Sequence, residues 1–400
     1  MPLRPPAGFI SAFYDPLNNP NAPTIGTATG GNTSASVTFT APSNVGGSAI
    51  SSYTALSTPG AFTGSSASSP VTVTGLTNGT SYTFAVWATN TYGPSAFSAS
   101  SNSATPAAVF GLFAGGSIDA GATNVIQYIS ITSTGNATDF GDLVNARYNL
   151  AACGSSTRSL FAGGEDASAT AAITYVNPVT TGNSESFGNL IGATTELAGC
   201  SNSTRGLFAG GVESGVRTNT IQYVTIATTG NTTDFGDLTL LQRLLASCSN
   251  TTTGIFAGGL TTSNAWTNVI NYVTIASTGD ATDFGDLTQS LYALCGASNS
   301  TRGVFAGGKN TGDAEVNVIQ YITIASAGNA TDFGDLITTF ARQGACASTT
   351  RAVFGGGATG ARSNVIQYVT IDTTGNATDF GDLLAANFQL CSTSNVHGGL

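Results

Sequence analysis

The sequence predicts an all-β protein in which one β-sandwich is followed by a closed ring of six similar β-sheets. Glycine accounts for 51 of 400 residues and charged residues for only 8%, a composition that favours short strands joined by turns. A set of motifs returns every 47–49 residues after residue 107, whereas the region before it has alternating strand patterns without a repeat. The length suits two or three domains, each with its own core.

Residues 1–21 are rich in proline and aromatic residues and predict an extended segment. The prolines exclude a stable helix, and the apolar side chains make a solvated tail unfavourable. We expect this segment either to attach the chain to another protein or to fold back on the chain's own sandwich. The candidate attachment residues are Phe9, Ile10, Phe13, Tyr14 and Leu17.

Residues 22–106 carry period-2 strand patterns separated by turn residues, which predicts a sandwich of two sheets. Leu76–Tyr82 matches a tyrosine corner, and Ala88–Gly93 matches a strand-end motif, so that the region resembles a fibronectin type III domain. The early buried tryptophan of that family is missing, and we expect Phe39 to take its place. The resemblance implies a spacer or docking module and says little else about function.

Residues 107–400 contain six copies of a unit with four strand-like pieces, the pattern of a β-propeller blade. Phe-Ala-Gly-Gly or Phe-Gly-Gly-Gly begins at Phe113, Phe161, Phe208, Phe256, Phe305 and Phe354. An alternating run follows around Tyr128, Tyr175, Tyr223, Tyr272, Tyr321 and Tyr368, and then a Phe-Gly-(Asp/Asn)-Leu piece at Phe140, Phe187, Phe235, Phe284, Phe333 and Phe380.

The cysteine-containing runs are offset from the Phe-Ala-Gly-Gly strands by one strand. The first unit lacks a preceding cysteine run and the last run is left over, so we expect the C-terminal strand to complete the first blade and close the ring, which removes free sheet edges. Small neighbours predict that the cysteines are buried free thiols near the axis, too far apart to be bridged. A disulfide framework is the alternative. The cysteines are Cys153, Cys200, Cys248, Cys295, Cys346 and Cys391.

The Gly-Gly pair followed by an aromatic residue on each of the next two strands resembles Kelch-type propellers. The resemblance covers residues 107–400 and implies a six-bladed Kelch-like β-propeller. It departs at the fourth strand, where phenylalanine stands in place of the Kelch tryptophan and lies further from the tyrosine.

Several function classes are disfavoured by composition. A formal net charge of −10 would repel nucleic acid. No apolar run approaches the ~18 residues that span a bilayer, and the first residues lack the apolar core of a secretory signal. We expect a chain made in the cytoplasm, with no membrane insertion. The one histidine, His397, lies at an end expected to fray, so we expect no enzyme, no catalytic residue, no cofactor and no metal site built on imidazole.

The repeated aspartates leave calcium as an open question. Pairs such as Asp139 and Asp142 recur, but one or two carboxylates per blade are few for a calcium site. The alternative is that they satisfy N–H groups of turns or pair with Arg158, Arg205, Arg302 and Arg351. The Asn-x-Ser/Thr sequences, for instance at Asn136 and Asn376, are interpreted as turn residues.

Comparison among the repeats predicts a binding face. The sequences of the connections after Gly-Gly and after the fourth strand differ from repeat to repeat, whereas the other two connections of each repeat barely change. Because successive strands alternate in direction, the two variable connections lie on the same face. Trp266 is of particular interest, because an aromatic residue in a polar loop suits sugar stacking or protein anchoring. Simple drift of unconstrained loops is the alternative. The candidate partner-binding residues are Asp119, Tyr148, Glu165, Arg217, Arg243, Trp266, Tyr292, Lys309, Asp313, Arg342 and Arg362.

The proline-rich start, the fibronectin-like module and the Thr-Gly-Asn-Ala-Thr-Asp-Phe-Gly-Asp-Leu repeats together resemble structural proteins of marine tailed phages. This resemblance implies a virion protein, a tail-fibre or appendage component. Residues 1–21 would attach to other virion proteins, and the propeller would bind a host-surface glycan or protein. The alternatives are a decoration or adaptor protein of the particle, a glycan depolymerase, which needs converging carboxylates, and a bacterial surface adhesin.

Overall fold

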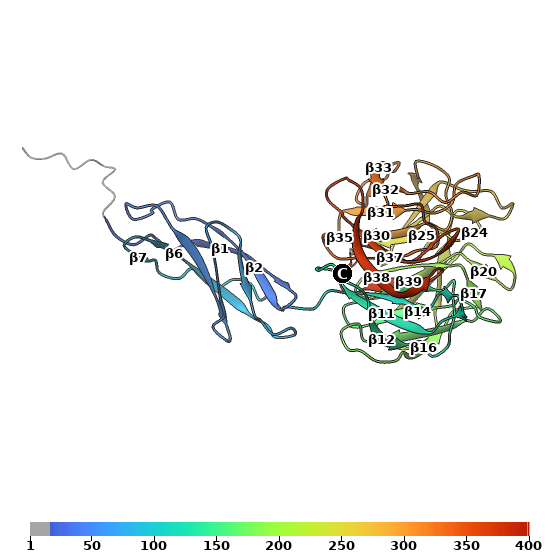
Figure 1. Ribbon diagram of the computed structural model, residues 1–400, viewed down its shortest axis with the longest axis horizontal. Helices are drawn as coiled ribbons and strands as arrows, with labels where there is room; N and C mark the ends of the chain where they lie inside the picture. The colour runs from blue at the N-terminus through green and yellow to red at the C-terminus, as the bar shows by residue number, and fades with distance from the viewer. Residues whose placement is uncertain (1–16, 398, 400) are drawn as a thin grey trace, which may run out of the picture. The chain divides into compact units, whose positions relative to one another are not determined.

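The computed structural model describes residues 17–397 and 399, which form strands, turns and loops without a helix (Figure 1). The chain divides into two compact units, with the division between Ala108 and Val109. This division lies two residues after the boundary expected from the repeats. We call the part up to Ala108 unit 1 and the part from Val109 unit 2, and describe each by itself.

Unit 1 is a sandwich of two antiparallel sheets. One sheet has the order β1 (Thr24–Gly31), β2 (Ser34–Thr40), β5 (Val71–Thr74), and the other β4 (Thr63–Ser66), β3 (Ser52–Thr58), β6 (Thr83–Asn90), β7 (Gly93–Pro94). Every second residue of β2, β3 and β6 is buried, as the period of a strand requires.

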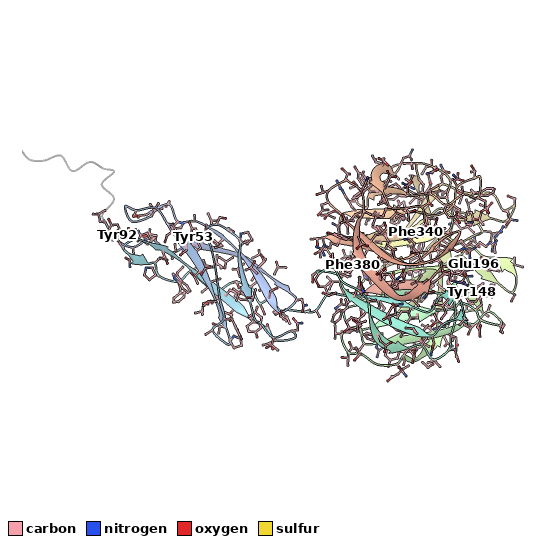
Figure 2. All side chains as sticks on the ribbon, viewed as in Figure 1. Tyr53, Tyr92, Tyr148, Glu196, Phe340 and Phe380 are labelled. Carbon is pink, nitrogen blue, oxygen red and sulfur yellow. The ribbon has the colours of Figure 1, made fainter. Side chains whose placement is uncertain are left out.

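The core of unit 1 contains the features that its sequence predicted. The Tyr82 hydroxyl accepts a hydrogen bond from the Thr77 N–H at 3.1 Å, which makes the tyrosine corner. Phe39 is buried, with its ring centroid 4.5 Å from that of Tyr53, labelled in Figure 2. Phe39 therefore fills part of the sandwich core, as expected of the residue that replaces the missing tryptophan.

Unit 2, over the residues described, contains six sheets of four long strands each, numbered I to VI. Sheets I to III are β39 (Cys391–Ser394), β8 (Phe110–Ala114), β11 (Val125–Ser130), β12 (Thr138–Asp142); β13 (Ala151–Gly154), β14 (Ser159–Ala162), β15 (Ala172–Val176), β16 (Glu185–Asn189); and β18 (Ala198–Ser201), β19 (Arg205–Ala209), β22 (Thr220–Thr225), β23 (Thr233–Asp237). Sheets IV to VI are β25 (Ala246–Ser249), β26 (Thr253–Ala257), β28 (Val269–Thr274), β29 (Thr282–Asp286); β30 (Cys295–Ser298), β31 (Arg302–Ala306), β32 (Val318–Thr323), β33 (Thr331–Asp335); and β34 (Gly344–Ala347), β35 (Arg351–Gly355), β37 (Ala361–Thr370), β38 (Thr378–Asn387).

Two-residue strands lie in the connections that follow the second and fourth strands. They are β9 (Ser117–Ile118), β10 (Gly121–Ala122), β17 (Thr194–Thr195), β20 (Val212–Glu213), β21 (Val216–Arg217), β24 (Gln242–Arg243), β27 (Leu260–Thr261) and β36 (Ala358–Thr359).

The first strands of the six sheets contact one another in a cycle. The contacts run from β39 to β13, β18, β25, β30 and β34, and from β34 back to β39. In sheet I, β39 pairs with β8 from the other end of unit 2, with Cys391 opposite Ala114 and Ser394 opposite Gly111. Sheet I is thus assembled from both ends of unit 2.

The core of unit 2 lies between neighbouring sheets. The cluster between sheets III and IV is typical: Leu207, Ile221 and Phe235 of sheet III pack with Phe256 and Ile275 of sheet IV. In each sheet the third-strand tyrosine meets the fourth-strand phenylalanine edge to face, with centroids 5.8–6.0 Å apart. The third-strand tyrosine and the fourth-strand phenylalanine therefore pair within each sheet, whereas the phenylalanine of the second strand packs against the neighbouring sheet.

The six cysteines are all buried free thiols, but they do not occupy one equivalent position. Cys153, Cys200, Cys248 and Cys346 lie opposite an aliphatic residue in the middle of the second strand. Cys295 and Cys391 lie opposite Ala306 and Ala114, two positions earlier in the strand. Alignment of the six runs on their cysteines treated all six as equivalent. That alignment was wrong for Cys295 and Cys391, which are shifted by two positions along the strand.

Candidate binding face

The fourth-to-first connections meet in a ring of six main-chain hydrogen bonds. Each ring residue donates its N–H to the carbonyl of the ring residue before it, at 2.8–3.0 Å, and the ring closes on itself. All six have φ between 54° and 62°, a region that disfavours L-residues by roughly 1–2 kcal/mol each. The hydrogen bonds compensate for that cost. The ring residues are Asn149, Glu196, Leu244, Ala293, Arg342 and Gln389.

The ring surrounds the mouth of a cavity of about 160 Å³ on the axis between the first strands. The N–H groups of the ring residues are all donated to ring carbonyls, so these six N–H groups are not available to a ligand. The second-to-third connections end on the same side of the sheets, since neighbouring strands are antiparallel. We call this side the variable face and the other side the constant face.

Tyr148, Glu165 and Glu196 lie close together where sheets II and III meet. Main-chain hydrogen bonds join Tyr148 to Glu165, and the Glu165 carboxylate accepts from Asn149 at 3.1 Å and Thr195 at 3.2 Å. Tyr148 and Glu196, labelled in Figure 2, come from consecutive fourth-to-first connections.

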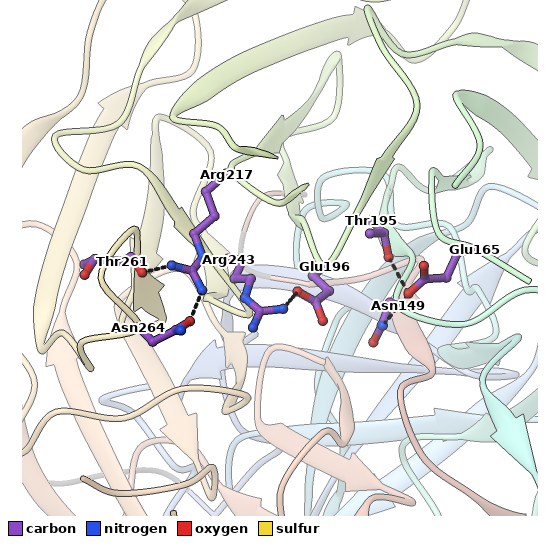
Figure 3. Close-up of polar contacts among 8 residues, drawn as sticks. All are labelled: Asn149, Glu165, Thr195, Glu196, Arg217, Arg243, Thr261 and Asn264. Carbon is purple, nitrogen blue, oxygen red and sulfur yellow. Dashed lines mark hydrogen bonds and ion pairs between the residues drawn. The ribbon is translucent and has the colours of Figure 1, made fainter. Parts of the chain in front are cut away.

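Two of the predicted arginines already have partners on this face (Figure 3). Arg243 forms an ion pair with Glu196 at 2.6 Å. Arg217 donates to the carbonyl of Thr261 and the side chain of Asn264 in the next second-to-third connection. These contacts tie neighbouring connections together and hold the arginines in place.

Trp266, Tyr292, Lys309 and Asp313 form a second group. The Tyr292 hydroxyl donates to Asp313, and burial together with this carboxylate raises the pKa of Tyr292 to about 12. Lys309 lies 3.7 Å from Asp313 and 3.4 Å from Glu315. Trp266 packs against Tyr292 with centroids 6.3 Å apart and has its Nε1 buried. The indole is half-buried and packs against Tyr292, and its predicted role in sugar stacking or protein anchoring stays a prediction.

Two predicted arginines remain, Arg362, which has a carboxylate partner, and Arg342, which has none among the described residues. Arg362 lies 2.8 Å from Asp119 and stacks over Phe388 at 5.0 Å. Arg342 differs, because among the described residues its guanidinium has no hydrogen-bond or ion-pair partner. It is close enough to Asp313 to help lower the pKa of that carboxyl, after the larger effect of Tyr292. Arg342 therefore carries a positive charge near Asp313 and Tyr292, while its residue also lines the axial cavity.

Gln343 is a polar residue whose amide lies in the core beside Gly307 and Gly357, and sequence reasoning missed it. It is 7% exposed, and neither amide atom has a hydrogen-bond partner among the described residues. The sequence does contain a signal, because the other five sheets have leucine at this position. These are Leu150, Leu197, Leu245, Leu294 and Leu390.

On the constant face, the repeated polar residues bond to protein groups. Each connection between the third and fourth strands contains an Asn or Asp whose side-chain oxygen accepts a main-chain N–H from the neighbouring sheet, at 3.0 Å. The donor is always the residue that follows Phe-Gly in the fourth strand. One of these bonds, from the Asp382 N–H to Asn136, joins sheets VI and I. The alternative in which the aspartates pair with arginines was wrong. Arg158, Arg205, Arg302 and Arg351 each lie over a tyrosine ring and donate to a carbonyl of the next sheet.

The structure also places the remaining chemical groups. Within the described residues there is no cluster of three or more His, Cys, Asp or Glu side chains that could hold a metal. His397 is partly buried at the constant-face end of the axis, where its Nε2 lies 3.2 Å from the Gly154 carbonyl oxygen, so this end is packed and not frayed. Desolvation lowers the pKa of His397 to about 4.

Most of the predicted attachment segment lies outside the described residues, including Phe9, Ile10, Phe13 and Tyr14. Leu17 is described and 64% exposed. The residues that follow it bond to unit 1: Asn18 to Gly46 and Asn21 to Asn44. The last part of residues 1–21 thus folds back on the sandwich.

Comparison with known proteins identifies unit 1. Residues 20–104 match the Fibronectin type III domain family. This part of the chain is therefore a fibronectin type III domain, with the strand order and tyrosine corner described above. No curated protein matches the chain. In the described part of the chain, no helix has the length and apolar character needed to cross a membrane.

Proposed function

We propose that unit 2 is a six-bladed Kelch-like β-propeller closed by β39. Two sets of contacts support this interpretation: the cycle of first strands from β39 through β34 and the ring of six main-chain hydrogen bonds at the axis. Each sheet would be one blade, and sheet I would be the blade completed from both ends of unit 2.

The propeller serves binding and not catalysis. Three carboxylates of the variable face are engaged by other side chains: Glu196 by Arg243, Asp119 by Arg362, and Asp313 by Tyr292 and Lys309. A depolymerase would need two carboxylates facing one substrate bond. The paired charges instead make a rigid surface that is arranged before a partner arrives.

The binding face belongs to a phage particle, in a tail fibre or appendage, and meets a glycan or protein on the host surface. The resemblance of the combined parts to tailed-phage structural proteins supports the location, with residues 1–21 as the attachment to other virion proteins. The observation that carries the binding role is the contrast between faces. Side chains that differ between repeats surround the axial cavity, while the constant face repeats the same Asn and Arg contacts.

The test uses bulky labels on the full chain. All six native thiols are buried and burial raises the pKa of each, so they react slowly with maleimides. Ser263→Cys introduces a thiol on an exposed loop of the variable face, and Thr134→Cys introduces a matched one on the constant face. Each would be coupled to a polyethylene glycol maleimide, and binding of the fluorescent chain to a panel of bacterial strains would be measured by flow cytometry.

We expect the label at position 263 to abolish cell binding and the label at position 134 to leave it intact. Binding that survives the label at 263 would contradict the proposed face. A chain that binds no cell but sits with its variable face against other proteins in electron micrographs of the particle would be an adaptor, and the host-binding role would be wrong.

A further inference from the structure

We propose that the constant face binds the guanidinium group of an arginine side chain of a partner protein, in a groove between sheets IV and V. The groove measures about 370 Å³ and is lined by Thr253, Tyr272 and Ile324, among others. An arginine of the chain itself occupies the equivalent place in four other sheets. This site lies on the constant face, so it does not depend on the proposed binding role of the variable face.

Four arginines show how this place recognises a guanidinium. Each lies at the start of a second strand, with its guanidinium 4.6–4.7 Å from the centroid of the third-strand tyrosine ring. The same guanidinium donates to a main-chain carbonyl of the next sheet at 3.0–3.1 Å. An aromatic face and a carbonyl oxygen thus act together on one cation, which stacks and donates at the same time. The arginines are Arg158, Arg205, Arg302 and Arg351.

Sheet IV has the tyrosine and the carbonyl but not the arginine. Thr253 has the register position that Arg205 has in sheet III. Tyr272 keeps the edge-to-face contact with its fourth-strand phenylalanine, with centroids 5.8 Å apart. The Ile324 carbonyl is equivalent to the Ile275 carbonyl that accepts from Arg205, and it has no hydrogen-bond donor among the described residues. Both recognition groups are therefore in place without their cation.

Sheet I also lacks the arginine, but it covers its tyrosine in another way. Phe110 takes the position there, and its ring meets that of Tyr128 edge to face, with centroids 5.1 Å apart. Over the described residues, sheet IV alone therefore has neither an arginine nor an aromatic ring at this position. The open groove is a property of this one sheet and not of the repeat.

The groove is accessible and favours a guanidinium over an ammonium group. Thr252, Ala325 and Ala327 line it and are exposed, so a side chain can enter from solvent. A guanidinium is planar and can stack on a ring while it donates in its plane, whereas an ammonium is a strongly hydrated point charge. The net charge of −10 attracts cations in general. An arginine of another protein would reproduce the contacts that the chain's own arginines make between its sheets.

The experiment measures saturation-transfer NMR of the full chain with the amide of N-acetyl-arginine, and with the amides of N-acetyl-lysine and N-acetyl-citrulline as comparisons. Citrulline has the shape of arginine without its charge. We expect signals for the arginine amide that are weak or absent for the other two. Thr253→Arg supplies the missing side chain from within, as in the four other sheets, and should weaken binding by about tenfold or more.

Two further variants serve as controls. Thr134→Arg adds the same charge at an exposed position of the constant face and should leave binding unchanged. Arg205→Thr makes the converse change, because it opens the same groove in sheet III. It should keep the fold, since sheet IV folds with threonine there, and raise the signal at a given concentration of the arginine amide.

Absence of binding by the native chain would overturn the inference, as would equal binding by the native chain and Thr253→Arg or no gain of signal in Arg205→Thr. Equal binding of the citrulline amide would show that the charge is not recognised, and equal binding of the lysine amide would overturn the assignment to a guanidinium. Stronger binding of free arginine than of its capped amide would make the free amino acid the ligand and overturn the assignment to a partner protein.

Discussion

Arg147 is a buried cation without a carboxylate partner. It is 3% exposed and donates to the carbonyls of Phe161, Gly163 and Ala172 and to the Thr174 hydroxyl, at 2.8–3.1 Å. In the other five sheets the place of Thr174 is taken by a longer amide side chain whose oxygen accepts an N–H from the preceding connection. These amides are Gln127, Gln222, Asn271, Gln320 and Gln367. Arg147 therefore fills the space that a missing glutamine leaves between sheets I and II.

We expect Arg147→Leu to lower the free energy of unfolding of unit 2 by about 2–3 kcal/mol, because it leaves polar groups without their charged donor. Adding Thr174→Gln recreates the Leu291 and Gln320 combination of sheets IV and V and should recover at least half of that loss. Denaturant unfolding followed by Trp266 fluorescence, in a Trp87→Phe background, measures both. A double variant no more stable than the single one would contradict the compensation.

At the scale of elements, three serines complete the edge of the second sheet of unit 1. The N–H groups of Ser95, Ser98 and Ser101 donate to the carbonyls of Ala88, Val86 and Phe84, and the hydroxyl oxygens accept the N–H groups of the same three residues, at 2.8–3.0 Å. The three serines are spaced three residues apart in sequence, whereas their partners on β6 are spaced two residues apart. A repeat of three residues is typical of a polyproline II backbone. The serine hydroxyls therefore accept the N–H groups of β6 that main-chain carbonyls would accept in a regular β-strand.

Ser98→Ala removes the acceptor of the Val86 N–H and should lower the stability of unit 1 by about 1 kcal/mol. Ser100→Ala is the matched control, since Ser100 is exposed and has no side-chain contact among the described residues. The unfolding midpoint of unit 1, followed by Trp87 fluorescence, distinguishes the two. Equal midpoints for both variants would show that water replaces the serine hydroxyl without loss.

At the scale of the whole molecule, the proposed closure would make unit 2 depend on its last strand, β39. Deleting residues 391–400 removes β39, which exposes the edge of β8 and opens the cycle of first strands. We expect loss of cooperative unfolding of unit 2, seen by Trp266, and an unchanged midpoint of unit 1, seen by Trp87. Deleting only residues 396–400 keeps β39 and the bond from the Phe110 N–H to Asn395, and should cost far less. Native-like unfolding after the larger deletion would contradict closure.

The sequence predicted the strands and sheet pairing of unit 2 well, because each repeat carries its own local motifs and the offset of the cysteine runs implies how the ends meet. It also predicted that the two variable connections lie on one side of the sheets, but not the contacts that their side chains make. Arg243 has an ion-pair partner and Arg342 has none among the described residues, and this difference depends on how loops from different repeats approach one another. Gln343 replaces the leucine found at the equivalent position of the other five sheets, a single substitution that is easily overlooked in the repeats. The polar neighbours of Trp266 in sequence also gave no sign that its indole packs against Tyr292.

The ring of hydrogen bonds at the axis uses main-chain atoms only, and the six residues that form it have six different side chains. The ring bonds therefore do not depend on the identity of these side chains, provided that each residue has an N–H and tolerates a positive φ. If the face binds a partner as proposed, selection can change the side chains of the ring one at a time while the main-chain bonds stay the same. The same independence makes these six positions a natural site for a combinatorial library of new binders.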